Sequence, residues 1–74
     1  KHLCVDDEDN IYIADDENAA IRRVDAKTHE VTTVLGAGQG VARIRLRHPH
    51  GVTWVRGWLY IVDMGNNRIL RIKP

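Results

Sequence analysis

Seven short apolar runs, each rich in Val, Ile, Leu or Tyr, alternate with polar turns along the chain. Runs of this kind, bounded by Gly, Asn and Asp, are typical of β-strands joined by tight turns. The first run shows no polar alternation, which favours burial on both faces. The pattern predicts a four-stranded antiparallel meander followed by a three-stranded one, with strands over residues 2–6, 10–14, 20–24, 31–35, 51–55, 58–62 and 68–72.

One hairpin of this pattern is written twice. Residues 10–24 read NIYIADDENAAIRRV, and residues 58–72 read WLYIVDMGNNRILRI. A shift of 48 positions superimposes Tyr12 on Tyr60, Asp15 on Asp63, Asn18 on Asn66, Ile21 on Ile69 and Arg23 on Arg71. A four-stranded meander that recurs at a period of about 40–50 residues is typical of a β-propeller blade. The sequence thus predicts an all-β fold of about two blades, over residues 1–40 and 41–74.

Two stretches connect the repeats. Residues 36–40 (GAGQG) predict a flexible connection between blades, and residues 41–47 alternate Arg with apolar residues, which predicts an extended, half-exposed segment. Pro49 then interrupts the pattern before the second meander starts. A helical solenoid is excluded because the β-branched runs lack a helical period. A seven-stranded sandwich remains open, but it does not explain the repeat.

Composition limits the class of protein without identifying its activity. The 74 residues are 43% hydrophobic and 28% charged, as expected of an ordinary globular domain, and the net charge is +1. A chain this short buries only about 60% of its unfolded surface, so its own core is marginal. Cys4 is the single cysteine and cannot form an internal disulfide. No apolar run is long enough to span a membrane, so we expect a soluble chain of undetermined compartment.

The repeated segments resemble the NHL repeat. PHGVTWV at 49–55, WLYIVDMGNNRILRI at 58–72 and NIYIADDENAAIRRVDAKTHEVTTVLG at 10–36 follow the family pattern over nearly the whole chain. The resemblance implies a propeller, commonly of six blades, in which the first strand of each blade lies nearest the axis. Two repeats do not close a ring. The remaining blades are expected from a longer parent chain or from self-association, in which three chains would give six blades.

The function implied by the resemblance is a scaffold that binds proteins or small ligands. A metal-dependent lyase or lactonase-like enzyme is the first alternative, which leaves enzymatic activity open. Pro49-His50 is similar to the motif that supplies metal ligands in the peptidyl-amidoglycolate lyases, so His50 is a candidate ligand for zinc or calcium on the propeller axis. His48 joins it as a candidate ligand-binding residue. The structural alternative is that both histidines lie at the surface where a strand begins.

RNA binding is the second alternative. Some NHL propellers of the tripartite-motif class bind single-stranded RNA on a basic face, and Arg43 and Arg45 lie on one side of the segment before the second meander. Arginine suits phosphate and carboxylate contacts, so these two residues are ligand-binding candidates. The nearly neutral chain lacks the strong basic field of a dedicated nucleic-acid binder.

Four polar residues recur at the two hairpin turns. Asp and Asn commonly hold tight turns through hydrogen bonds to the local backbone, and a catalytic acid is needed once rather than in both repeats. We therefore predict a structural role in the turns for Asp15, Asn18, Asp63 and Asn66.

Overall fold

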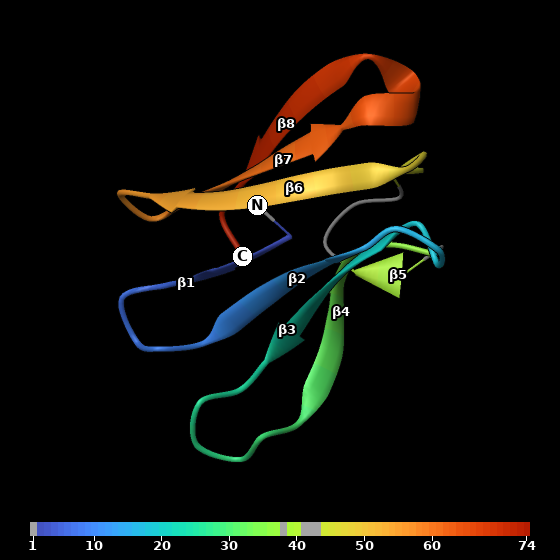
Figure 1. Ribbon diagram of the computed structural model, residues 1–74. Helices are drawn as coiled ribbons and strands as arrows, with labels where there is room; N and C mark the ends of the chain where they lie inside the picture. The colour runs from blue at the N-terminus through green and yellow to red at the C-terminus, as the bar shows by residue number, and fades with distance from the viewer. Residues whose placement is uncertain (1, 38, 41–43) are drawn as a thin grey trace.

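The chain forms two antiparallel β-sheets. The computed structural model describes residues 2–37, 39–40 and 44–74. The first sheet has the strand order β1-β2-β3-β4-β5 and the second the order β6-β7-β8 (Figure 1). The elements are β1 (Leu3–Val5), β2 (Ile11–Asp15), β3 (Ala20–Val24), β4 (Val31–Gly36), β5 (Gln39–Gly40), β6 (Pro49–Val55), β7 (Trp58–Asp63), the 3-10 helix η1 (Met64–Asn66) and β8 (Arg68–Ile72). The all-β prediction is confirmed.

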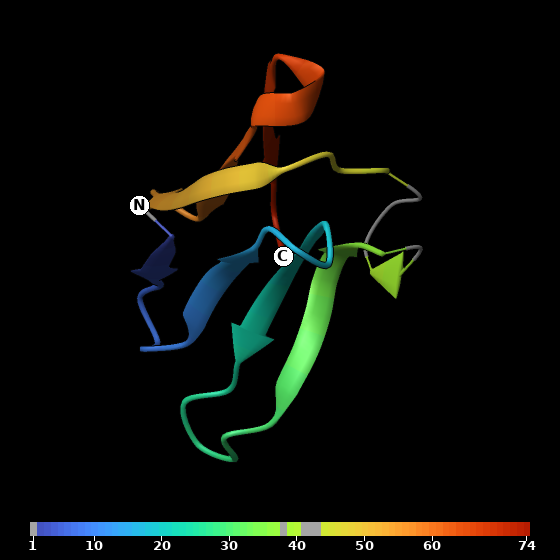
Figure 2. The same ribbon diagram turned by 45° about the vertical axis from the view of Figure 1, so that its right-hand side comes forward.

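The two sheets lie face to face. In Figure 1 the second sheet, coloured yellow to red, lies above the first, and the turned view in Figure 2 shows the same layering. Strand β6 contacts both β1 and β2. We call the first sheet blade 1 and the second sheet blade 2. Within the described ranges, no helix has the length and apolar character needed to cross a membrane.

The strand registers reproduce the sequence repeat. Tyr12 pairs with Arg23 in blade 1, and Tyr60 pairs with Arg71 in blade 2, which keeps the shift of 48 positions. The first strands follow a shift of 49 instead, because Leu3 pairs with Ile13 whereas Val52 pairs with Ile61. The turn between the first two strands is one residue shorter in blade 2, and this accounts for the difference.

The apolar core lies between the blades. Successive side chains of a strand point to opposite faces of its sheet. The face of each sheet that is turned toward the other blade is here called the junction face. The stack of Tyr12 on Trp54 crosses the junction, with ring centroids 5.7 Å apart and an interplanar angle of 7°. Burying a side chain such as Leu or Ile contributes about 1.5–3 kcal/mol. The junction faces contribute Tyr12, Ala14, Ile21 and Leu35 from blade 1 and Val52, Leu59 and Ile61 from blade 2.

The opposite faces of the two sheets, here called the open faces, carry apolar side chains that neither blade covers. On blade 1 this face includes Leu3 and Val5, and on blade 2 it includes Val62 and Ile69. The prediction that residues 2–6 are buried on both faces is therefore wrong. Strand β1 has a blade on one side only, so every second side chain meets solvent.

The connection between the blades is more regular than predicted. Gln39 and Gly40 form β5, which pairs with Leu35 and Gly36, so the expected flexible linker is wrong at these positions. Gly36 has a φ of 92°, and a β-carbon there would collide with the backbone of Ala19 and Ala20.

The approach to blade 2 also differs from the prediction. Residues 44–46 form no regular strand, and residues 41–43 of the predicted extended segment lie outside the described part of the chain. Strand β6 begins at Pro49, two residues earlier than predicted. Proline is tolerated as the first residue of a strand because no ladder hydrogen bond is needed from its nitrogen there.

Truncation of the junction core tests this packing. We expect Leu59→Ala, at a fully buried side chain, to lower the free energy of unfolding by about 2–5 kcal/mol through lost burial and a new cavity. Val31→Ala, at an exposed position of β4, should change it by less than about 0.5 kcal/mol. Urea unfolding followed by circular dichroism measures both. Equal effects of the two substitutions would contradict the junction as the main core.

Candidate functional site

The carboxylate of Asp63 joins three parts of the chain at the end of β7. Its Oδ1 accepts the backbone N–H of Arg47 at 2.7 Å, and its Oδ2 accepts Nδ2 of Asn66 at 2.8 Å and Nε of Arg68 at 2.7 Å. The side chain is fully buried. Burial by itself would raise the pKa of Asp63, but these hydrogen bonds outweigh it and hold the pKa below its ordinary value.

The same network ties the segment before blade 2 to the turn after β7. Nη2 of Arg68 donates to the backbone oxygen of Arg45 at 2.7 Å, and the N–H of Gly65 donates to the backbone oxygen of Arg47 at 2.7 Å. A β-carbon at Gly65 would collide with Arg47, so this close approach requires glycine. The sequence predicted that Asp63 holds its own turn. The structure shows that its backbone donor comes from 16 residues upstream.

Asp15, the repeat equivalent of Asp63, has a looser network. Its Oδ2 accepts Nδ2 of Asn18 at 2.9 Å and Nε of Arg22 at 3.2 Å. The hydrogen bond from Asn18 has the largest effect and lowers the pKa of Asp15; burial opposes it, and the hydrogen bond from Arg22 adds to the lowering. Both ion-pair partners are about a quarter exposed, so solvent weakens this pair.

Asp6 and Asn10 hold the turn between β1 and β2, a role that the sequence pattern did not assign to them. Oδ1 of Asp6 accepts the N–H groups of Glu8 and Asn10, and Oδ2 accepts the side chains of Asn10 and Tyr12. Burial favours a raised pKa for Asp6, but these four donors together lower it. Oδ1 of the buried Asn10 accepts the N–H of Ala26 from the next turn. The bond from the N–H of Glu8 to Asp6 was predictable, because an Asp in a tight turn commonly accepts the backbone N–H two residues further along the chain.

The histidines separate into two contacts. The rings of His2 and His50 meet edge to face with centroids 5.1 Å apart, which brings together the starts of the first strands of both blades. His48 lies elsewhere, with Nδ1 at 3.2 Å from Oδ1 of Asp16. Zinc sites use three or four protein ligands. Across residues 2–37, 39–40 and 44–74, no group of three or more His, Cys, Asp or Glu side chains is arranged to hold a metal. The described residues therefore bring two imidazole rings together at this point and add no third candidate ligand.

Of the two candidate arginines, the structure describes Arg45. Arg43 lies outside the described residues. Arg45 is exposed and, together with Ile44, Asn66 and Arg68, lines a surface hollow of about 660 Å³. Its backbone oxygen is held by Arg68, whereas no hydrogen bond or ion pair is found for its side chain within the described ranges.

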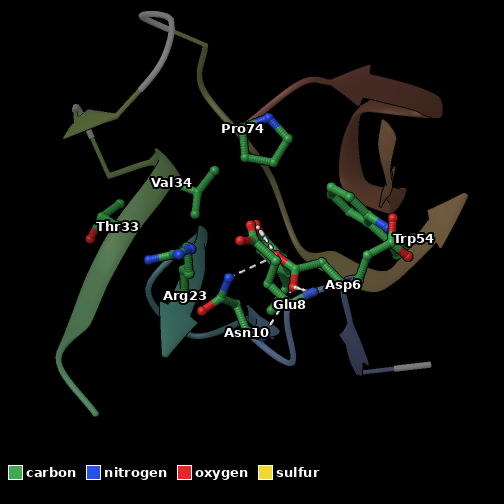
Figure 3. A pocket seen from close by; sticks show the side chains of 10 residues that line it. Asp6, Glu8, Asn10, Arg23, Thr33, Val34, Trp54 and Pro74 are labelled. Atoms are coloured by element: carbon green, nitrogen blue, oxygen red, sulfur yellow. Dashed lines mark hydrogen bonds between the residues drawn. The ribbon is translucent and has the colours of Figure 1, made fainter. Parts of the chain in front are cut away.

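A cavity of about 440 Å³ opens at the junction of the blades. Figure 3 shows Arg23, Thr33 and Val34 on one side of it and Trp54 on the other, with the turn from Asp6 to Asn10 between them. Pro74 lies across the cavity from that turn (Figure 3). Both blades therefore wall it, and the predicted ligand-binding residues that the structure describes, His48, His50 and Arg45, do not line it.

Two blades of one repeated unit, packed face to face around a common core, define the chain as part of a β-propeller. No protein-family profile matches the sequence. An alignment of 80 residues, over 86% of this chain, gives 31% identity to NHL repeat-containing protein 2 of Bos taurus. The chain belongs to the NHL repeat family. It spans 11% of the length of that relative.

Asp63→Asn tests the buried carboxylate. The pKa of Asp63 is lower in the folded than in the unfolded chain, so its contribution to stability is present above the ordinary aspartate pKa and is lost as pH falls through the lower folded value. We expect Asp63→Asn to cost about 2–3 kcal/mol at neutral pH and to flatten the acid limb of stability against pH. Asp15→Asn, the matched control, should cost less than about 1 kcal/mol. Urea unfolding from neutral to acid pH measures both variants. A larger loss of stability in Asp15→Asn than in Asp63→Asn would contradict the conclusion that Asp63 is the more strongly stabilised carboxylate.

The zinc hypothesis has its own test in the histidine pair. It predicts that Zn²⁺ binding, measured by calorimetry, is lost in His2→Ala and in His50→Ala, because each removes half of the protein donors. His48→Ala, whose ring contacts Asp16, should bind Zn²⁺ as the parent chain does. Binding that none of the three substitutions changes would reject this site.

Proposed function

We propose that the chain is a binding scaffold whose ligand site is the cavity at the blade junction. The supporting observation is a space of about 440 Å³ walled by rigid strands of both blades and by the turn between β1 and β2. Ligand sites commonly have volumes of about 300–1,000 Å³ and combine apolar walls with a few polar groups. A rigid sheet that positions a polar turn is a common arrangement for binding residues.

The charges of the cavity favour a basic ligand. Three carboxylates, those of Asp6, Asp7 and Glu8, line it against one guanidinium, that of Arg23. The oxygens of Asp6 are occupied by its own turn, and Arg23 lies 3.4 Å from Asp25. Asp7 and Glu8 take part in no ion pair among the described residues, and both are exposed at the rim. We expect them to attract a positive group on the ligand.

A lysine or arginine side chain of a protein partner fits this arrangement. Its aliphatic stem would lie along the apolar wall formed by Val34, Trp54 and Pro74, while its charged end stays near the carboxylates and solvent. The metal-dependent enzyme and the RNA-binding module remain hypotheses. They rest on the pair of His2 and His50 and on the exposed Arg45, each of which offers fewer converging groups than the cavity.

Fluorescence of Trp54 tests the proposal. The chain has two tryptophans, so Trp58→Phe leaves Trp54 as the reporter on the cavity wall. We expect a short blocked peptide with one lysine to shift its emission, and Glu8→Gln to weaken binding about twofold to fivefold, the range for an exposed charge pair. Glu17→Gln, in the turn between β2 and β3, is the charge-matched control and should have no effect. Equal binding of a peptide with norleucine in place of lysine would contradict the proposed ligand class.

A further inference from the structure

The outer edge of blade 1 leaves part of strand β4 without a neighbouring strand. Figures 1 and 2 both show β4 at the edge of the sheet, with β5 beside its upper end. β5 pairs with Leu35 and Gly36, and no other described strand pairs with the outer side of β4. Residues 31–34, here called the edge segment, therefore leave about 13 Å of strand unpaired on this side. The edge segment lies inside the chain, since β3 precedes it and β5 follows it.

The hydrogen bonds of the β3–β4 hairpin indicate which backbone groups point outward. The N–H of Asp25 donates to the backbone oxygen of Glu30 at 2.9 Å, and Val31 and Thr33 follow Glu30 in the same register by one and three residues. Hydrogen-bonded and non-hydrogen-bonded pairs alternate along an antiparallel ladder. Val31 and Thr33 therefore form non-hydrogen-bonded pairs with β3. Their N–H and C=O groups point to the outer edge.

The edge segment is held in place from its inner side. The register with β3 shifts between Ile21 and Arg22, which makes Val34 the extra residue of a β-bulge. Val34 is buried in the junction core, and Nη1 of Arg22 donates to the side-chain oxygen of Thr33. The outward backbone groups of β4 are thus fixed in an extended arrangement before any partner binds.

The edge segment lacks the residues that commonly protect a sheet edge. Proteins guard such edges with proline, with charged side chains such as lysine, or with a bulge. Residues 31–34 read VTTV, so every side chain is β-branched and none is charged. The bulge comes at the last of these residues, so Val31 to Thr33 remain regular. β-Branched residues favour the extended backbone that pairs with a further strand.

We propose that the edge segment binds an extended segment of a partner protein, which adds to blade 1 as an antiparallel strand. The chain already contains this interaction in short form, since β5 pairs antiparallel with the same edge at Leu35 and Gly36. Alternating outward N–H and C=O groups are complemented by an extended backbone. β-Branched cross-strand pairs stabilise a sheet, so the partner segment is uncharged and rich in Val and Thr. Binding at this edge needs none of the carboxylates of the junction cavity.

N-methylated peptides test this binding mode. The probe is a blocked, uncharged peptide, acetyl-Gln-Val-Thr-Val-Thr-Gln-amide, whose binding is measured by calorimetry. Each N-methyl group removes one donor and blocks one side of the peptide backbone. We expect methylation at alternate positions to weaken binding about tenfold or more, because hydrogen bonds to β4 are lost, and methylation between them to have no effect. Equal effects at all positions, or no binding of the unmodified peptide, would overturn the proposal.

Amide hydrogen exchange locates the bound peptide. In the chain alone, the N–H groups of Val31 and Thr33 should exchange rapidly, whereas that of Thr32, which is directed to β3, should exchange slowly. Addition of the peptide should slow exchange at Val31 and Thr33 about tenfold or more, because both N–H groups gain acceptors. Peptide binding without protection at these two positions would place the peptide elsewhere and overturn the proposal.

Thr33→Pro removes one outward donor of the edge segment. Proline is tolerated on an edge strand where the N–H faces solvent, so the variant should fold, as circular dichroism checks, and should bind the peptide about tenfold more weakly. Thr33→Val loses the hydroxyl that Arg22 contacts but keeps the N–H, so this matched control should bind as the parent chain does. Equal binding by both variants would contradict the proposal. If Thr33→Pro does not fold, the methylated peptides decide.

A second copy of the chain is the competing occupant of the edge segment. Protection of Val31 and Thr33 that rises with protein concentration in the absence of peptide would assign the edge to self-pairing and overturn the proposal. Glu8→Gln should bind the uncharged peptide as the parent chain does, because the carboxylates of the cavity take no part. Loss of lysine-peptide binding in that variant therefore concerns the cavity alone, and failure of the uncharged peptide to bind concerns the edge alone.

Discussion

The contact between the two junction faces is the interaction on which the rest of this structure depends. A single twisted sheet must bury one face against another layer to be stable. Blade 1 covers Leu59 and Ile61 of blade 2, and in return blade 2 covers Ala14 and Ile21. The stack of Tyr12 on Trp54 fixes one end of this contact. The junction cavity and the pairing of His2 with His50 exist only because β6 lies against β1 and β2.

Asp63 provides the second constraint. Its buried carboxylate accepts donors from the segment before blade 2, from the turn after β7 and from β8. A buried carboxylate is tolerated only when hydrogen bonds replace its lost hydration. The network therefore fixes the path by which the chain enters blade 2, and with it the position of His50 next to His2. Asp15, its counterpart in blade 1, accepts Asn18 and Arg22 from its own hairpin and is partly exposed.

The blades also differ in charge, which changes how the basic residues are interpreted. The nearly neutral total argued against nucleic acid when the chain was considered as a whole. Counted by blade, the acidic residues lie almost entirely in the first repeat and most of the basic ones in the second. This separation places opposite net charges on the two halves that meet at the internal junction.

Local pattern was enough to determine the architecture. Short β-branched runs between polar turns are fixed by backbone preference and by alternation, so the strands, the repeat and the NHL resemblance were all visible in the residues. The sequence could not show which face of each strand is covered, because that depends on which blade lies beside it; Leu3 and Val5 were expected to be buried and are exposed. The tertiary structure also decided the donors of Asp63, the meeting of His2 with His50 and the cavity beside Asp6. The pairing of His2 with His50 and the cavity need the packing of one sheet on the other, whereas Asp63 receives its distant donor, the N–H of Arg47, from the segment that enters blade 2.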